Sequence, residues 1–87
     1  MTTDELYKKL SEAKIPIRWK TLIYDAYCSG YKTAALFAPR NWYNKYGEDA
    51  LTGLYRYTGF KNEAITVFAE TCVGMELIGY KITIYFE

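Results

Sequence analysis

The amino-acid sequence predicts a small α+β domain in which helices come first and an antiparallel hairpin follows. Two patterns predict this class. Apolar residues recur at helical spacing through much of the first two thirds of the chain, and apolar and polar residues alternate in the last third. The length of 87 residues gives room for one hydrophobic core and little more. We therefore expect residues 1–87 to form a single small globular domain.

The first helix is predicted at about residues 3–13. Thr2 or Thr3 is a suitable N-cap, and Glu5 stands three residues after Thr2, which is the spacing of a capping box. The apolar stripe of this helix comprises Leu6, Leu10 and Ala13. Pro16 stops the helix, because proline cannot extend the hydrogen-bond ladder and restricts the residues before it.

The second helix is predicted at about residues 17–28. Its apolar residues fall at i, i+3, i+4, i+7 and i+8, and they are Trp19, Leu22, Ile23, Ala26 and Tyr27. A strand is the alternative, because Trp, Thr, Ile and Tyr favour strands. A period of two, however, would place Asp25 on the same face as Ile23 and Tyr27. The Ser-Gly pair at 29–30 closes the helix.

Residues 41–57 are predicted to be helical in two pieces. The first piece is one turn at residues 42–46, and Gly47 is expected to break the helix after it. The second piece covers about residues 48–57 and begins with two acidic residues, which favour the positive end of the helix dipole. Gly59 follows this piece and ends it.

The last third of the chain predicts an antiparallel hairpin with strands at about residues 64–70 and 76–86. The first strand alternates around Ile65, Val67 and Ala69. The second strand places on one face Ile78, Tyr80, Ile82, Ile84 and Phe86. Residues 31–37 are too short for periodicity to decide between a two-turn helix and a third short strand. Because a two-stranded hairpin is marginal in water, we expect its apolar face to lie against the helices.

The residue types that catalysis and metal binding require are scarce. Histidine is absent, which excludes Ser-His-Asp and Cys-His catalysis and two-histidine metal sites. The adjacent carboxylates of Glu48 and Asp49 point in different directions on a helix, so they are better explained as a helix start than as a metal site. Asp25, Glu63 and Glu70 have no visible partner for acid–base work. We expect no enzyme activity, no metal and no cofactor.

Targeting and redox signals are also few. The N-terminus is polar and acidic, unlike a signal peptide, and no apolar run approaches the roughly 18 residues of a membrane helix. We therefore expect a cytoplasmic protein with no membrane partner. Cys28 and Cys72 are far apart in the sequence, and we expect both to be reduced, buried thiols.

Aromatic residues are the unusual feature of the composition. Ten tyrosines, four phenylalanines and two tryptophans make up 18% of the chain. Burying all of them would use a large share of the surface that folding hides, so we expect some rings at the surface. Tyrosine, tryptophan, arginine and asparagine are typical of protein–protein hot spots and paratopes, although Trp42 could equally fill the core. The predicted partner-binding residues are Arg40, Trp42, Tyr43, Lys45, Tyr46, Tyr55, Arg56 and Tyr57.

The sequence predicts a non-enzymatic protein-binding module that acts by covering the surface of a partner. By analogy of size and composition alone, this description fits phage and mobile-element inhibitors of a host nuclease or defence complex, such as anti-CRISPR proteins. The expected partner is therefore a host protein or complex. A homodimer formed through the aromatic residues or a strand edge is the other interaction that the sequence allows.

A winged-helix-like DNA-binding protein is the alternative, because helices followed by a hairpin are its layout. Its phosphate contacts would be Lys32, Arg40, Lys45, Arg56 and Lys61. A formal net charge of only +1 and the two carboxylates that begin the helix at 48–57 argue against it. Aromatic residues interleaved with basic ones also suit stacking on single-stranded bases, which is a weaker form of the same prediction.

Overall fold

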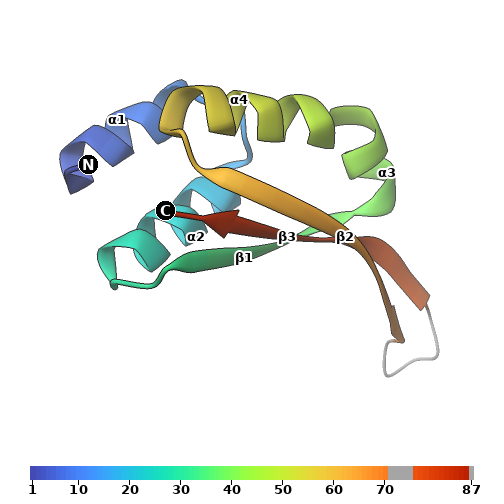
Figure 1. Ribbon diagram of the computed structural model, residues 1–87. Coiled ribbons are helices and arrows are strands. Elements are labelled where there is room, and N and C mark those ends of the chain that lie inside the picture. Colours follow the sequence, from blue (N-terminus) through green and yellow to red (C-terminus); the bar gives the residue numbers. More distant parts are fainter. Residues whose placement is uncertain (71–75, 87) are drawn as a thin grey trace.

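The computed structural model describes residues 1–70 and 76–86 and has the predicted class, with helices packed on an antiparallel sheet (Figure 1). The helices are α1 (Thr3–Glu12), α2 (Ile17–Cys28), α3 (Arg40–Trp42) and α4 (Glu48–Thr58), and a π-helical turn, η1 (Tyr43–Gly47), joins the last two. The strands are β1 (Thr33–Pro39), β2 (Lys61–Glu70) and β3 (Glu76–Tyr85). The segment left open at 31–37 therefore forms a third strand, β1.

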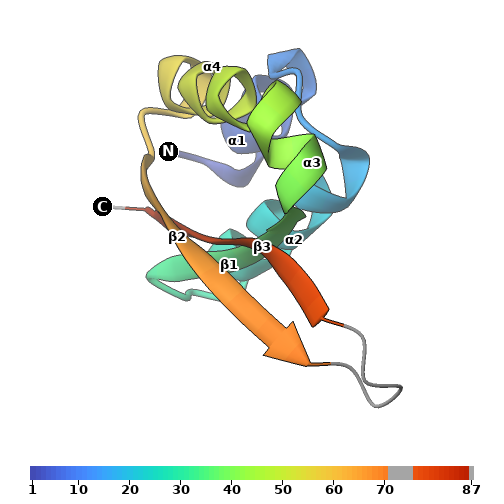
Figure 2. The same ribbon diagram turned by 90° about the vertical axis from the view of Figure 1, so that its right-hand side faces the viewer.

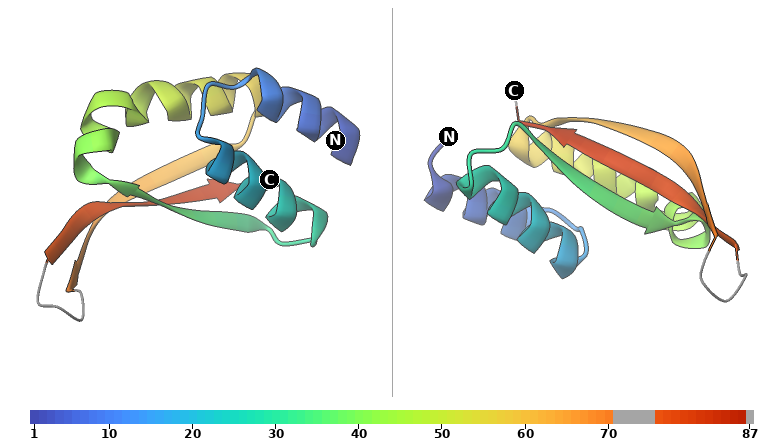
Figure 3. Two further views of the ribbon diagram at one scale, coloured as in Figure 1. Left: turned by 180° about the vertical axis from the view of Figure 1, so that it is seen from behind. Right: turned by 90° about the horizontal axis from the view of Figure 1, so that it is seen from below.

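The strand β3 lies in the centre of the sheet, and the strand order is β1-β3-β2. Both neighbouring strands are antiparallel to β3. Ile82 of β3 pairs with Leu36 of β1 on one side and with Ala64 of β2 on the other. The predicted hairpin thus gains a third strand, which an isolated hairpin needs for stability. The C-terminal end of β2 and the N-terminal end of β3 extend past the helices (Figure 3).

The core lies between the helices and one face of the sheet (Figure 2). Burial alternates along β1, so that Ala34, Leu36 and Ala38 face the helices. Ile82 and Ile84 of β3 are fully buried beside them, as the predicted alternation requires. The helices contribute Leu6, Leu10, Trp19, Ile23, Ala50, Leu51 and Leu54 to this core.

Local sequence signals set the helix ends. The backbone N–H of Glu5 donates to Oγ1 of Thr2 at 3.1 Å, which confirms Thr2 as the N-cap of α1. The helix α2 has the bounds that the sequence predicts. Gly59 ends α4 in the left-handed conformation, with φ of 75°, and its N–H donates to the carbonyl oxygen of Tyr55 at 2.8 Å.

The predicted helix break at Gly47 is wrong. Gly47 has helical backbone angles of φ −61° and ψ −45°, and the helix continues from α3 through η1 into α4 (Figure 1). A Cβ atom on Gly47 would lie 2.6 Å from Cγ of Tyr43, so the Tyr43 ring lies directly on the helix backbone. The same ring stacks on Tyr80 of β3, with the ring centroids 3.9 Å apart. Glycine is therefore required here for space.

Two further expectations need correction. Cys28 is exposed, because it lies five positions after the fully buried Ile23 and so points away from the core. Cys72 lies outside the described residues. Ile65 and Val67 do not face the helices, because the pairing of β2 with β3 turns the even-numbered residues of β2 toward the core.

Candidate functional site

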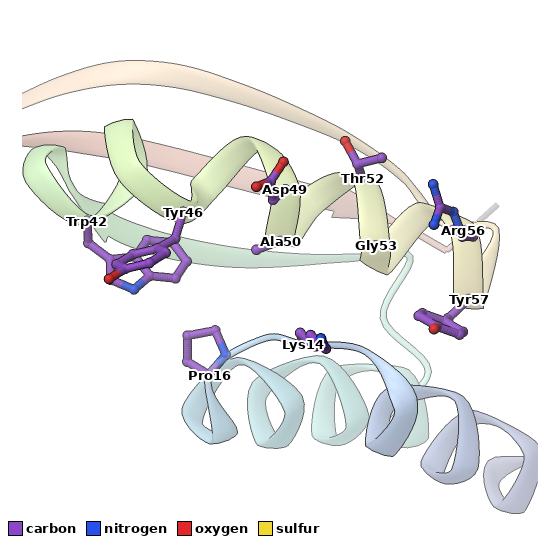
Figure 4. Close-up of a pocket in the computed structure, with 10 residues that line it drawn as sticks. All are labelled: Lys14, Pro16, Trp42, Tyr46, Asp49, Ala50, Thr52, Gly53, Arg56 and Tyr57. Atoms are coloured by element: carbon purple, nitrogen blue, oxygen red, sulfur yellow. The ribbon is translucent and has the colours of Figure 1, made fainter.

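A groove runs along α4 on the side that faces the link between α1 and α2 (Figure 4). Its volume is about 700 Å³. The lining residues are Lys14, Pro16, Trp42, Tyr46, Asp49, Ala50, Thr52, Gly53, Arg56 and Tyr57. The groove thus brings together four of the eight predicted partner-binding residues, which are Trp42, Tyr46, Arg56 and Tyr57.

Aromatic side chains form one end of the groove, near Pro16 (Figure 4). The indole of Trp42 is half-buried and packs edge-on against the buried Trp19, with centroids 5.0 Å apart and planes at 66°. The Tyr46 ring lies 6.0 Å from Trp42 and is 49% exposed, and Nζ of Lys45 lies 5.2 Å from its centroid. The core therefore holds Trp42 in place, whereas Tyr46 remains available to solvent.

Arg56 and Tyr57 lie at the other end of the groove, and Lys14 lies between the two ends, opposite the small residues of α4 (Figure 4). Lys14 and Arg56 are exposed cations, and Asp49 on the rim carries the one carboxylate of the lining. Ala50 and Gly53 have little or no side chain, so they leave space in the groove above this part of α4. The lining therefore has a net positive charge, with two rings at one end and the ring of Tyr57 beside Arg56 at the other.

Helical spacing explains one wall of the groove. The residues Tyr46, Ala50, Gly53 and Tyr57 follow the positions i, i+4, i+7 and i+11, which share a helix face. The sequence prediction recognised the aromatic members of this face and overlooked the small ones, although their spacing is the same. Lys14 and Pro16 were also missed, because they lie in a different segment and no local pattern relates that segment to α4.

The other four predicted residues lie outside the groove. Tyr43 and Tyr55 lie on the side of the helix that faces β2, at a smaller hollow of about 270 Å³. Arg40 is exposed at the start of α3, and Lys45 is exposed in η1. The structure therefore divides the predicted set: four residues line the groove, two lie at the smaller hollow, and Arg40 and Lys45 line neither.

Another hollow of about 340 Å³ lies between α1 and α2. Its lining includes Tyr7, which is 66% exposed, and Ile17, which is 80% exposed. The Tyr7 ring meets Tyr24 edge-on at 6.0 Å. The pKa of Tyr24 is raised above its ordinary value of 10.0, first by a side-chain hydrogen bond with Cys28 and then by the negative charge of the Cys28 thiolate. This hollow is mostly apolar, and its lining has one cation, Lys20, where the groove along α4 has two.

Three observations bear on the kind of site. Within residues 1–70 and 76–86, no three His, Cys, Asp or Glu side chains are grouped so that they could hold a metal ion. Asp25 is exposed and Glu63 accepts a hydrogen bond from Tyr85, while the side chain of Glu70 lies outside the described part of the chain. No helix among the described residues is long and apolar enough to span a membrane.

Comparison of the chain with protein-family models, with curated proteins and with solved structures gave no match. A function for the groove is therefore argued from its shape, its rings and its charges.

Proposed function

We propose that the domain is a non-enzymatic protein-binding module that takes a segment of its partner into the groove along α4. The observation that carries this proposal is the pairing of an anchored ring, Trp42 on Trp19, with the exposed ring of Tyr46. Rings that are fixed before binding lose little conformational freedom in the complex. Tyrosine, tryptophan and arginine also dominate the residues that carry binding energy at protein interfaces.

Charge and length define the segment that fits the groove. Lys14 and Arg56 outnumber the single carboxylate of Asp49, so the groove favours an anionic group near Arg56. Ten residues separate Tyr46 from Arg56, which at the helical rise corresponds to about 15 Å. An extended chain covers this distance in about five residues. The expected segment carries a large apolar side chain and a carboxylate about five residues from it.

The proposal extends to the class of partner. Small size and a high aromatic content support a phage or mobile-element inhibitor that covers a host nuclease or defence complex in the cytoplasm. An inhibitor of this kind needs no catalytic group, because covering a surface is sufficient for its action. This extension rests on analogy of size and composition, whereas the groove itself supports only the binding of a protein segment.

Selection of random displayed peptides on the immobilised domain tests the proposal. We expect enrichment of peptides in which an aromatic or large aliphatic residue and an acidic residue stand about five positions apart. Tyr46→Ala and Arg56→Glu should each weaken binding of the enriched peptides about 30-fold or more, as for a hot-spot residue. Tyr55→Ala and Arg40→Glu are matched controls, because they change the same residue types outside the groove and should leave binding unchanged.

Two results would overturn the proposal. One is enrichment of peptides that bind the groove variants and the control variants equally well. The other is a domain that is dimeric by sedimentation equilibrium and becomes monomeric in Tyr46→Ala, which would assign the groove to a second copy of the chain. Circular dichroism of each variant checks that a loss of binding is not a loss of folding.

For the winged-helix alternative, α4 would be the helix that reads DNA. Its first turn carries Glu48 and Asp49, both exposed, which the phosphate backbone would repel. The five predicted phosphate contacts are all exposed, and three of them, Arg40, Lys45 and Arg56, lie on the continuous helix from Arg40 to Thr58. The other two lie elsewhere, with Lys32 before β1 and Lys61 at the start of β2. The observations therefore favour a protein partner for this side of the molecule.

A further inference from the structure

The sheet has a second face that none of the described helices covers. In β1 the odd-numbered residues point to this face, and register places the odd-numbered residues of β2 and β3 beside them. Figure 3 shows the strands in front of α4 when the molecule is seen from below. This open face shares no residue with the groove along α4.

Two rows across the open face each place an aromatic ring next to a lysine. In one row Tyr85 of β3 lies opposite Lys61 of β2. In another row Phe37 of β1 lies opposite Lys81 of β3. All four side chains are exposed, with 36% of Tyr85 and 38% of Phe37 accessible. Lys81 and Tyr85 are four residues apart on β3, so the rows are separated by about 13 Å.

Both rings are held against the sheet. The Phe37 ring covers Gly79, since a Cβ atom there would lie 2.5 Å from Cζ of Phe37. The Tyr85 hydroxyl donates to Oε2 of Glu63 at 3.0 Å, which leans the ring from β3 toward β2. Rings fixed in this way need little reordering to accept a flat ligand.

The lysine in the centre of the face indicates what kind of ligand fits. Lys81 lies on the central strand between Phe37 and Ile65, so an apolar partner covering this row would remove the ammonium group of Lys81 from water. A second copy of the same face would bury two such groups. An anionic ligand, in contrast, would neutralise Lys81 and Lys61. Charge therefore favours a polyanion over another apolar surface.

We propose that the open face of the sheet binds single-stranded nucleic acid, with bases stacked on Phe37 and Tyr85 and phosphates bound by Lys81 and Lys61. Stacking on aromatic side chains tolerates any base, so this binding has little sequence preference. Glu63 opposes it, because its carboxylate lies between the two rows and repels phosphate.

Fluorescence anisotropy with labelled oligothymidine and oligouridine at low salt tests this site, and the two probes distinguish DNA from RNA. Two phosphate contacts predict a plot of log affinity against log salt with a slope of about −1.4. Lys81→Ala should reduce the slope by about 0.7. Phe37→Leu, which keeps an apolar cover over Gly79, should weaken binding about fivefold or more, the loss expected for one stacked base. Glu63→Gln should strengthen binding.

The controls are cation and ring substitutions on the helical side of the molecule. Arg40→Ala and Tyr46→Ala should bind the oligonucleotides as the unmodified domain does, so this site and the groove succeed or fail independently. Three results would refute the site: no binding at low salt, affinity unaffected by Phe37→Leu, or a duplex of the same length bound as tightly as the single strand. Thermal unfolding of each variant confirms that it is folded.

Discussion

Replacing Gly47 with alanine tests the packing inside the continuous helix from Arg40 to Thr58. Where no side chain packs over the glycine, substitution of glycine by alanine in a helix interior stabilises a protein by about 1 kcal/mol. Alanine is favoured because it loses less backbone freedom on folding. At Gly47 the new Cβ would sit 2.6 Å from Cγ of Tyr43. Ordinary carbon–carbon contacts begin at about 3.5 Å, so the ring has to move by about 1 Å.

The expected net effect is destabilisation by about 1–3 kcal/mol. Forcing an extra methyl group into a packed site costs about 1–3 kcal/mol. Moving the Tyr43 ring also disturbs its stack on Tyr80, which is worth about 0.5–1.5 kcal/mol. The gain in helix propensity offsets part of both costs. For a domain of this length the melting temperature should fall by about 4–24 °C.

Gly53 in the same helix is the matched control. A Cβ atom there would meet nothing within 4 Å among the described residues, so Gly53→Ala should raise the melting temperature by about 4–8 °C. Urea unfolding followed by circular dichroism measures both changes. The double variant Gly47→Ala/Tyr43→Ala should lose most of the steric penalty. The reasoning is refuted if Gly47→Ala stabilises the domain as Gly53→Ala does.

Three other perturbations follow from the described contacts. Leu54→Ala should destabilise the domain by about 2–5 kcal/mol in urea unfolding, because Leu54 is fully buried; a loss below 1 kcal/mol would contradict its place in the core. Gly79→Ala should cost about 1–3 kcal/mol by the same assay, since the carbonyl oxygen of Ala38 would lie 2.6 Å from the new Cβ and backbone cannot yield as a side chain does; a neutral effect would argue against this close approach. Glu63 raises the pKa of Tyr85 above 10.0 through a hydrogen bond and its charge, so the Glu63–Tyr85 contact stabilises the fold below pH 10 and is lost as the pH rises through the folded value. Glu63→Gln should lower the Tyr85 pKa in an NMR titration, and an unchanged pKa would exclude the contact.

Helix positions were predictable because their signals are local. Thr2 caps α1 through a hydrogen bond that its neighbour three residues later provides, and Gly59 ends α4 in a conformation that glycine adopts without strain. The bounds of α2 follow from a stripe that includes Trp19 and Ile23. Each of these signals needs only a few consecutive residues.

The features that sequence reasoning missed depend on contacts between distant segments. Gly47 looks like a helix breaker until Tyr80 is known to hold the Tyr43 ring over it. Ile65 looks like a core residue until pairing with β3 turns it to the open face. Lys14 joins the groove only because the α1–α2 link is packed beside α4, and no local pattern in the sequence relates these two segments.

The central position of β3 has a consequence for how the chain reaches this fold. Leu36 pairs with Ile82, which lies more than half the chain length further along, and neither β1 nor β2 has a neighbouring strand before β3 joins the sheet. Pairings of such high contact order form slowly, because the entropy of closing a long loop has to be lost before the contact is made. Folding rate should therefore be limited by docking of residues 76–85, with the helical segments able to form transiently before that step.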